Sequence, residues 1–451
     1  MARRDIPTVP MLRRRFLQLA AAATASTVTA FGCTRTHAAQ RRPLRVGVVG
    51  GGIVGASLAY HLSEAGARVT LFEKAQPGSG ATQNSFAWLN AFVADPKYRA
   101  LRLQSLMAYH DLDVRLKLGI VWGGYTHWAG TAAEVQSLQE SAAQMSATPY
   151  PVRTIDAAEL TAMTPSLMPG PVAAAFFSRI DGHLNPVEAT LRFLDAARQR
   201  GATVMLQCEV QGLDRKHGAL TGVRTNQGHF PLDRLIVAGG VDTPSILAMT
   251  GFDLKLRHSP GILAHSSPTS IITPTIFDAP GNLSFKQMAD GSIVGTDSPE
   301  PPDTAVHREI RTRAMAFPDE GLRAMHGNRI LTKIAQVLPA ARGVTLDRLT
   351  LGFRPMPPDE LPVVGALPGM PDVYVAVTHS GVTLAPILGR YVAQEAMTGS
   401  RAEALAPFRP ERFAGTNPAE RFDLAGERAL GAVNEPFALV VGGRTPPMPG
   451  Q

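Results

Sequence analysis

Apolar runs alternate with amphipathic segments along the chain, and this alternation predicts the first elements of the fold. Residues 44–49 form a short apolar run typical of a buried strand, and residues 56–65 are typical of a helix that ends at Gly66. Residues 68–72 are again strand-like and lead to Glu73. A strand, a helix and a second strand in this order predict a βαβ unit, and therefore an α/β protein.

Later segments continue the mixture of helix and strand patterns. Helices are expected at 188–200 and 384–398, strands at 202–210, 220–225 and 229–235, a tight turn at Asn226-Gln227-Gly228, and a short strand at 437–441. We have no functional interpretation of the last of these segments.

A glycine-rich turn separates the first strand from the first helix. It reads Gly50-Gly51-Gly52-Ile53-Val54-Gly55, which is the spacing of a dinucleotide-binding turn. Gly50 permits the tight turn, Gly52 lets the backbone approach a pyrophosphate, and Gly55 lets the helix pack on the strand. The helix N-terminus offers N–H groups and a positive dipole to the pyrophosphate. Glu73 stands where the adenosine ribose hydroxyls are bound, so the segment predicts a dinucleotide cofactor.

The residues after Glu73 favour FAD over NAD. Residues 76–82 form a second loop of small residues, and 85–91 are a mixed apolar stretch suited to line a flavin ring. A nicotinamide dehydrogenase would normally continue into further strand–helix units at this point.

The N-terminus has the pattern of an export signal. Arg13-Arg14-Arg15-Phe16-Leu17 precedes an apolar run of about 15 residues, which is shorter than the roughly 20 that a spanning helix needs. The pattern is similar to the twin-arginine motif, so we expect a periplasmic or otherwise exported protein. Cleavage after Ala38 is favoured. The alternative is a lipoprotein box that ends at Cys33, and only this alternative would give the protein a membrane anchor.

Composition and charge exclude several other classes of protein. A hydrophobic fraction of 45% is too high for a disordered chain. The net charge is +7, but residues 1–38 alone carry +5, and no basic stripe follows them, so no nucleic-acid partner is expected. Two cysteines, Cys33 and Cys208, exclude a disulfide framework and a cysteine-rich zinc site. The histidines show no ligand spacing, so no metal site is expected.

Five further segments carry a resemblance to a known family. They are DGHLNP at 181–186, LIVAGG at 235–240, GFRPMPPDELPVVG at 352–365, YVAVTHSGVTLAP at 374–386 and FRPERF at 408–413. Together with the glycine-rich turn, they make the chain similar to the D-amino-acid oxidase/glycine oxidase superfamily of FAD-dependent oxidoreductases. The resemblance covers residues 43 to 413.

The resemblance implies an α/β fold with two interleaved domains. A Rossmann-like FAD-binding domain is expected from 43–98, 183–255 and 350–414. An α+β substrate domain, built on a mixed or antiparallel sheet, is expected from 99–182 and 256–349. The export signal at 1–38 would precede both domains, and a tail at 415–451 would follow them.

The resemblance also implies site residues. Arg354 is expected to bind a substrate carboxylate, although it could instead pair with Asp359 or Glu360. His379 is a second candidate catalytic residue, although a packing or hydrogen-bonding role is as compatible with its position. The expected cofactor-binding residues are Gly50, Gly52, Ile53, Val54, Gly55, Glu73, Lys74, Gly80, Ala81, Thr82, Val210, Ala238, Gly239, Gly381, Val382 and Thr383. Backbone N–H groups at the start of the helix near residue 381 would face the pyrimidine edge of the flavin.

The implied activity is oxidation of the CH–NH bond of an amino acid or secondary amine by hydride transfer to FAD, with oxygen, a quinone or a cytochrome as electron acceptor. The alternatives are a dehydrogenase of a hydroxy substrate, suggested by Pro357 where Ser or Thr is commoner, and a non-catalytic FAD-bound lipoprotein. Non-covalent FAD is expected, because residues 351–353 hold no cysteine, and Gln83 and Asn84 stand where relatives with histidyl-linked flavin carry histidine. The sequence leaves the oligomeric state open.

Two remaining residues have structural interpretations. Cys208 is expected in the core of the FAD-binding domain. His127 lies among Trp122, Tyr125 and Trp128, where an aromatic core strand is favoured over a substrate contact.

Overall fold

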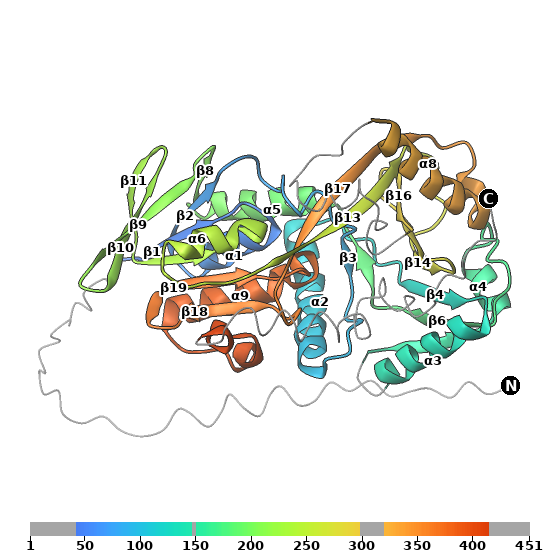
Figure 1. Ribbon diagram of the computed structural model, residues 1–451, viewed down its shortest axis with the longest axis horizontal. Coiled ribbons are helices and arrows are strands. Elements are labelled where there is room, and N and C mark those ends of the chain that lie inside the picture. The colour runs from blue at the N-terminus through green and yellow to red at the C-terminus, as the bar shows by residue number, and fades with distance from the viewer. Residues whose placement is uncertain (1–41, 147–149, 298–319, 415–451) are drawn as a thin grey trace, which may run out of the picture. The chain divides into compact units, whose positions relative to one another are not determined.

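The structure is a computed structural model, and it describes residues 42–146, 150–297 and 320–414 (Figure 1). The signal expected at 1–38 and the tail expected at 415–451, with the strand predicted inside it, lie outside these ranges. No helix in the described ranges is long and apolar enough to cross a membrane.

Within these ranges the strands form four sheets, and the first is a six-stranded sheet. Its members are β1 (Arg45–Val49), β2 (Arg68–Glu73), β8 (Thr203–Leu206), β12 (Arg234–Val237), β18 (Val363–Leu367) and β19 (Met370–Val377). Their order is β18-β19-β12-β1-β2-β8. β18 is antiparallel to β19, and the other neighbours are parallel. This arrangement confirms the predicted α/β sheet.

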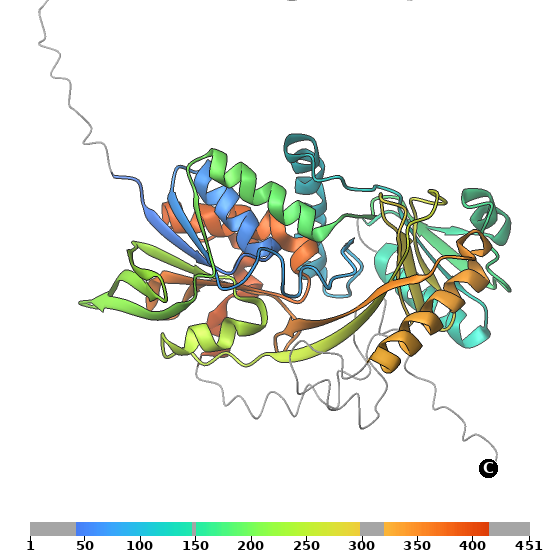
Figure 2. The same cartoon turned by 90° about the horizontal axis from the view of Figure 1, so that it is seen from above.

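Helices cover one face of this sheet. They are α1 (Ile53–Glu64), α5 (Pro186–Gln199) and α9 (Gly381–Thr398). α1 contacts both α5 and α9, and the blue, green and red helices lie side by side in Figure 2. Alternate strand residues face opposite sides, so Val46 and Val48 of β1 join the core under these helices, whereas Val49 joins the core on the other face.

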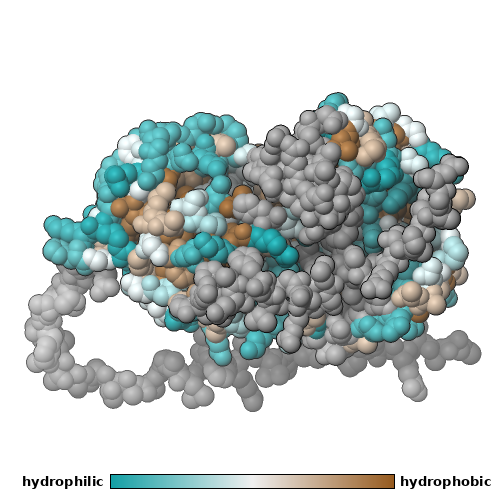
Figure 3. Space-filling view, in the orientation of Figure 1, coloured by the Kyte–Doolittle hydropathy of each residue, from teal (hydrophilic) through white to brown (hydrophobic). Residues whose placement is uncertain are grey.

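The other face is covered by α6 (Thr243–Ala248) and a three-stranded antiparallel sheet. The strands of this sheet are β9 (Val210–Lys216), β10 (Ala219–Thr225) and β11 (Gly228–Pro231). Hydrophilic side chains gather over this sheet on the face shown in Figure 3. Cys208 is buried in the core beneath it, as predicted.

Two predicted strands are divided in the structure. The strand predicted at 202–210 ends as β8 at Leu206, because Gln207 has a left-handed φ of 53° that departs from extended strand geometry. The strand predicted at 229–235 is shared between β11 and β12. The chain changes sheets there, at Asp233, whose carboxylate accepts hydrogen bonds from Arg45 at the start of β1. The three predicted helices at 56–65, 188–200 and 384–398 are confirmed as α1, α5 and α9.

The largest sheet in the described ranges has eight strands. They are β4 (Tyr125–Ala129), β5 (Val152–Ile155), β6 (Ala174–Ser178), β13 (Arg257–Ser266), β14 (Ile276–Ala279), β15 (Leu283–Gln287), β16 (Ile293–Thr296) and β17 (Leu346–Met356). Their order is β17-β13-β16-β15-β14-β4-β6-β5. Only β14 and β4 are parallel among these paired neighbours, so this is the mixed sheet that was expected.

Four further helices and one strand pair complete the elements used below, and of these α2 packs against α9. They are α2 (Pro96–Leu116), α3 (Ala132–Ser146), α4 (Ala157–Met163), α8 (Glu320–Val337) and the two-stranded antiparallel pair β3 (Trp88–Leu89) and β7 (Gly182–His183). α4 and α8 pack over one core of the eight-stranded sheet. Tyr125 and Trp128 are fully buried in β4, which confirms the aromatic core strand around His127.

The domain limits stay a prediction. Strands of the six-stranded sheet come from 45–73, 203–237 and 363–377, which lie inside the segments expected for the FAD-binding domain. β17 crosses the limit expected between residues 349 and 350, and all of it belongs to the eight-stranded sheet.

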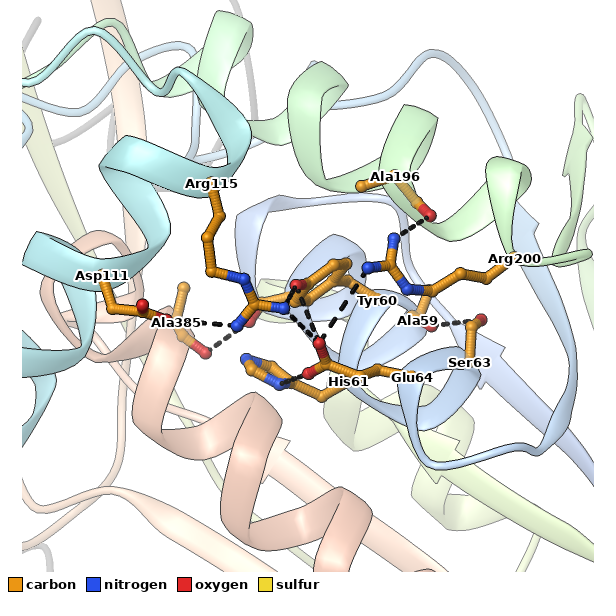
Figure 4. A network of polar contacts seen from close by, with 11 residues as sticks. Ala59, Tyr60, His61, Ser63, Glu64, Asp111, Arg115, Ala196, Arg200 and Ala385 are labelled. Carbon is orange, nitrogen blue, oxygen red and sulfur yellow. Dashed lines mark hydrogen bonds and ion pairs between the residues drawn. The ribbon is translucent and has the colours of Figure 1, made fainter. Parts of the chain in front are cut away.

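Glu64 is the centre of a polar network that joins three helices (Figure 4). Its carboxylate accepts hydrogen bonds from Tyr60 of α1 at 3.1 Å and from Arg115 of α2. His61 lies 3.5 Å from the other carboxylate oxygen, and Arg200, just after α5, lies 4.0 Å away. The hydrogen bonds from His61 and then from Arg115 and Tyr60 outweigh burial, and they lower the pKa of Glu64 from 4.5 to about 2.

Replacing Glu64→Gln should therefore destabilise the protein. Because the pKa is lowered in the folded state, the carboxylate stabilises the fold above pH 4.5, and this contribution is lost as the pH falls toward 2. The side chain is 36% exposed, so solvent screening reduces the expected loss to about 1 kcal/mol at neutral pH. Thermal unfolding between pH 2 and 7 measures it.

The matched control is Glu188→Gln, which removes an exposed ion pair with Arg192 on α5. We expect this control to change stability by less than about 0.5 kcal/mol. Two results would contradict the stabilising role of the Glu64 carboxylate. One is an equal loss of stability in the two variants, and the other is a loss in Glu64→Gln that is as large at pH 2 as at pH 7.

Candidate active site

A cavity of about 630 Å³ lies between the six-stranded sheet and the strands β13 and β17. The carboxyl ends of four parallel strands reach it, at Val49, Glu73, Ala238 and Val377. Open α/β sheets bind their ligands at this edge, and the volume lies within the range of ligand-binding pockets.

The N-terminus of α1 faces one part of the cavity. Gly52 is its N-cap and supplies no side-chain cap, while the N–H of Ile53 donates to Thr82 Oγ1 at 3.1 Å. Gly50 has a φ of 105°, and a Cβ there would lie 2.4 Å from the carbonyl oxygen of Ala238. The turn therefore requires glycine, and the helix presents its positive end to the cavity.

Glu73 and Lys74 follow β2 at the same edge. Glu73 is buried, and its carboxylate accepts hydrogen bonds from the N–H groups of Gly51 at 2.6 Å and Ala75 at 2.7 Å. A carboxylate has about four acceptor positions, so Glu73 retains capacity for ribose hydroxyls. Lys74 Nζ lies 2.8 Å from Asp242, and hydrogen bonding to this carboxylate raises the pKa of Lys74.

The N-terminus of α9 faces another part of the cavity. Ser380 is its N-cap but makes no side-chain capping bond, and Gly381 and Val382 begin the helix. His379, immediately before the N-cap, places its Nδ1 3.2 Å from Ser380 Oγ and packs edge-on to the Tyr98 ring. Two helix N-termini thus meet one cavity, which is a strongly favourable environment for negative charge.

Arg354 enters the cavity from β17. Its Nη2 donates to Ser259 Oγ at 2.8 Å, across the β13–β17 pairing. The two neighbouring acids are bound by other arginines, Asp359 by Arg412 and Glu360 by Arg257. The guanidinium itself lines the cavity, where it can meet a ligand.

Trp88 is held beside the cavity by a buried carboxylate. Its indole Nε1 donates to Asp181 at 2.7 Å, and Asp181 also accepts hydrogen bonds from Tyr150 at 2.6 Å and Ser178 at 2.5 Å. Burial raises the pKa of Asp181 to about 7, although these three hydrogen bonds oppose the rise. Asp181 opens the DGHLNP motif, and its structural task is to anchor this tryptophan.

Lys286 lies behind the same stretch of chain. It is buried, its Nζ is 3.5 Å from the carbonyl oxygen of Ala87, and it stands over the ring of Phe86. Burial lowers the pKa of Lys286 to about 7. Ala87 has a left-handed φ of 55°, a conformation that L-residues other than glycine rarely adopt, and it marks local backbone strain at the cavity wall.

The structure brings almost all of the predicted site residues together. Those that line the cavity are Gly50, Gly52, Ile53, Val54, Glu73, Lys74, Gly80, Ala81, Thr82, Val210, Ala238, Gly239, Arg354, His379, Gly381, Val382 and Thr383. Gly55 does not line it. A Cβ at Gly55 would lie 1.9 Å from the carbonyl oxygen of Gly50, so this glycine permits helix packing, as predicted for it. The individual roles stay predictions.

Asn90, which belongs to the stretch 85–91 expected to line a flavin ring, lines the cavity, and so does Arg102, which the sequence did not single out. Arg102 is 2% exposed, and arginine is rarely buried so deeply without a specific reason. The available signal was the spacing of the polar residues Arg102, Ser105 and Tyr109, which places them on one face of a helix. In the described residues no group of three or more His, Cys, Asp or Glu side chains could hold a metal ion.

The arrangement fits an FAD molecule. The glycine turn and α1 suit the pyrophosphate, Glu73 suits the ribose, and the apolar stretch 85–91 with the first turn of α9 suits the flavin ring. The tight contact of Gly50 with Ala238 leaves no room for a side chain in this turn.

Comparisons with known proteins agree with this geometry. A family model described as FAD dependent oxidoreductase matches residues 45–395. The chain is 28% identical to the uncharacterized oxidoreductase YurR of Bacillus subtilis over 80% of this chain and 97% of that protein. It is 25% identical to the glycine oxidase of Geobacillus kaustophilus over 82% of this chain and 97% of that protein.

A solved structure shares the fold. The L-proline dehydrogenase from P. horikoshii superposes with a TM-score of 0.72 at 24% identity, over 82% of this chain and 98% of that one. The family match spans most of the described residues and includes the whole glycine turn. The chain therefore belongs to the DAO family of FAD-dependent oxidoreductases, and FAD is its cofactor.

Proposed function

We propose that the protein oxidises the CH–NH bond of an amino acid or a secondary amine that carries a carboxylate. The observation that carries the proposal is Arg354, a guanidinium that lines the cavity and is held at its wall by a hydrogen bond to Ser259 Oγ. A planar guanidinium binds a carboxylate through two parallel, charge-assisted hydrogen bonds. Two similar proteins, a glycine oxidase and an L-proline dehydrogenase, are named for substrates that carry an amine and a carboxylate.

The protein's own groups bind, orient and desolvate the substrate. Arg354 would fix the carboxylate and thereby the position of the adjacent carbon. Phe86, Trp88 and Phe353 are buried and contribute apolar surface to the cavity, which excludes water. FAD, when bound, supplies the acceptor of the hydride.

We propose that the flavin is bound without a covalent bond. The side-chain amides of Gln83 and Asn84 donate to the backbone carbonyls of Ser79 and Gly80, and an amide is not a nucleophile that forms a flavin linkage. The electron acceptor is oxygen, a quinone or a cytochrome. Reoxidation of the reduced protein by air and by a soluble quinone distinguishes them.

Replacing Arg354→Ala should raise KM for carboxylate-bearing amines by about 100-fold, because a paired, charge-assisted contact is lost. Bound FAD should be unchanged. The variant should also lose the preference of the wild type for an amino acid over its methyl ester. Steady-state kinetics on both substrates measures these effects.

The matched control is Arg348→Ala, which removes an exposed arginine from the same strand. It should leave KM within about twofold of the wild type, since Arg348 contacts Asp347 and His265 and does not line the cavity. An Arg354→Ala variant with unchanged KM and an unchanged preference for the acid would contradict the proposed substrate class.

We also propose that the protein is exported by the twin-arginine route. The support is the Arg13-Arg14-Arg15-Phe16-Leu17 motif with its short apolar run, and the dinucleotide cofactor, which gives a reason to fold before export. The mature chain would start at Ala39 and be soluble, or start at a lipid-bearing Cys33.

Replacing Arg13→Lys and Arg14→Lys together should retain the protein in the cytoplasm with FAD bound. Cell fractionation measures this retention, and mass spectrometry of the mature N-terminus of the wild type separates the Ala39 and Cys33 starts. Undiminished export of the double variant would rule out the twin-arginine route.

A further inference from the structure

The first turn of α9 has a broken hydrogen-bond ladder. Pro386 lies inside this helix, and because proline has no N–H, the carbonyl of Val382 loses its donor four residues on. The hydroxyl of Tyr109, from α2, donates to this carbonyl oxygen at 2.5 Å. Tyr109 is fully buried, and burial raises its pKa well above the ordinary value, so the hydroxyl keeps its proton and stays a donor.

Two more side chains of α2 contact the same turn. Ser105 Oγ donates to the carbonyl oxygen of Thr383 at 2.6 Å. Arg102 donates to the hydroxyl of Ser380, the N-cap residue. The spacing of residues 102, 105 and 109 places the three side chains on one face of α2, so a single helix supports the start of α9 from behind.

The opposite side of this turn faces the cavity. Ser380, Gly381, Val382 and Thr383 all line it, and Arg102 lines it as well. Arg102 is 2% exposed and also contacts Asn90 Oδ1 at 2.7 Å and the Tyr98 hydroxyl at 3.2 Å, which are neutral groups. A buried guanidinium thus stands beside the positive end of a helix, and both favour a negatively charged ligand in the cavity.

We propose that Arg102, Ser105 and Tyr109 are positioning residues that fix the first turn of α9 and its positive potential against the flavin, and so raise the reduction potential of the bound FAD. Reduction places negative charge on the pyrimidine end of the flavin, which is the end expected at α9. Fixed N–H groups and a fixed cation stabilise that charge more strongly in a buried site than in water. Loosening the turn or removing the cation should therefore lower the potential.

The test measures the two-electron midpoint potential of the holoprotein and its affinity for sulfite, an anion that adds to oxidised flavin and leaves it negatively charged. Arg102→Met should weaken sulfite binding by at least tenfold and lower the potential by about 30 mV for each factor of ten. Tyr109→Phe should weaken sulfite binding by about fivefold, the usual effect of one lost buried hydrogen bond.

The matched control is Tyr60→Phe. Tyr60 is an equally buried tyrosine on α1, but its hydroxyl contacts Glu64 and Arg115 instead of α9. Loss of the Tyr60 hydroxyl should lower the stability of the protein without changing its sulfite affinity or the midpoint potential of the flavin. If the role of Tyr109 is merely structural, Tyr109→Phe and Tyr60→Phe will change sulfite affinity and midpoint potential equally. Equal changes would therefore overturn the proposal.

A rescue variant tests the mechanism itself. Pro386→Ala restores an N–H that can donate to Val382, so the pair Tyr109→Phe with Pro386→Ala should recover most of the sulfite affinity lost by Tyr109→Phe alone. If the double variant loses as much sulfite affinity as the two single variants together, Tyr109 does not act through the carbonyl of Val382. If Tyr109→Phe does not fold, Ser105→Ala decides the question, with unchanged affinity and potential counting against the proposal. These measurements need bound FAD but no substrate, so they are independent of the proposed amine oxidation.

Discussion

The close packing of α1 against α9 is the constraint on which the rest of the structure depends. Gly389 permits it, since a Cβ there would lie 2.4 Å from Ser57 Oγ. Ser57 Oγ also donates to the carbonyl oxygen of Ala385 at 2.7 Å. Because the two helices lie side by side on one sheet, both of their N-termini reach the edge where the parallel strands end (Figure 2). One cavity thereby receives two positive helix ends that are more than 300 residues apart in the chain.

This arrangement favours a ligand that carries negative charge. Two helix N-termini and the buried Arg102 concentrate positive potential around the cavity. A cofactor with a pyrophosphate at one end and a ring that gains negative charge at the other satisfies both helix ends. We infer that α2 contributes to this balance, because it holds the first turn of α9 in place where Pro386 has weakened it.

The parts of the site that depend on local sequence could be predicted. The glycine turn, Glu73 and the helices α1 and α9 follow from periodicity and spacing, and the motif around Arg354 placed that residue near the cavity. The contacts of α2 could not be predicted, because Tyr109 and Val382 are 273 residues apart and no local pattern pairs them. The break at Gln207 was missed for another reason: a left-handed residue other than glycine leaves no clear signal in an alternating strand pattern.

We propose that the substrate of this cavity is an amine that carries a carboxylate and that its hydrogen leaves as hydride to bound FAD. The most direct measurement is anaerobic mixing of the holoprotein with matched panels of amino acids, N-alkyl amino acids and 2-hydroxy acids, followed by the visible absorbance of the flavin. Our account predicts that at least one amine of the panel bleaches the flavin and that the hydroxy acid of the same carbon skeleton does not. Bleaching by hydroxy acids alone would contradict it.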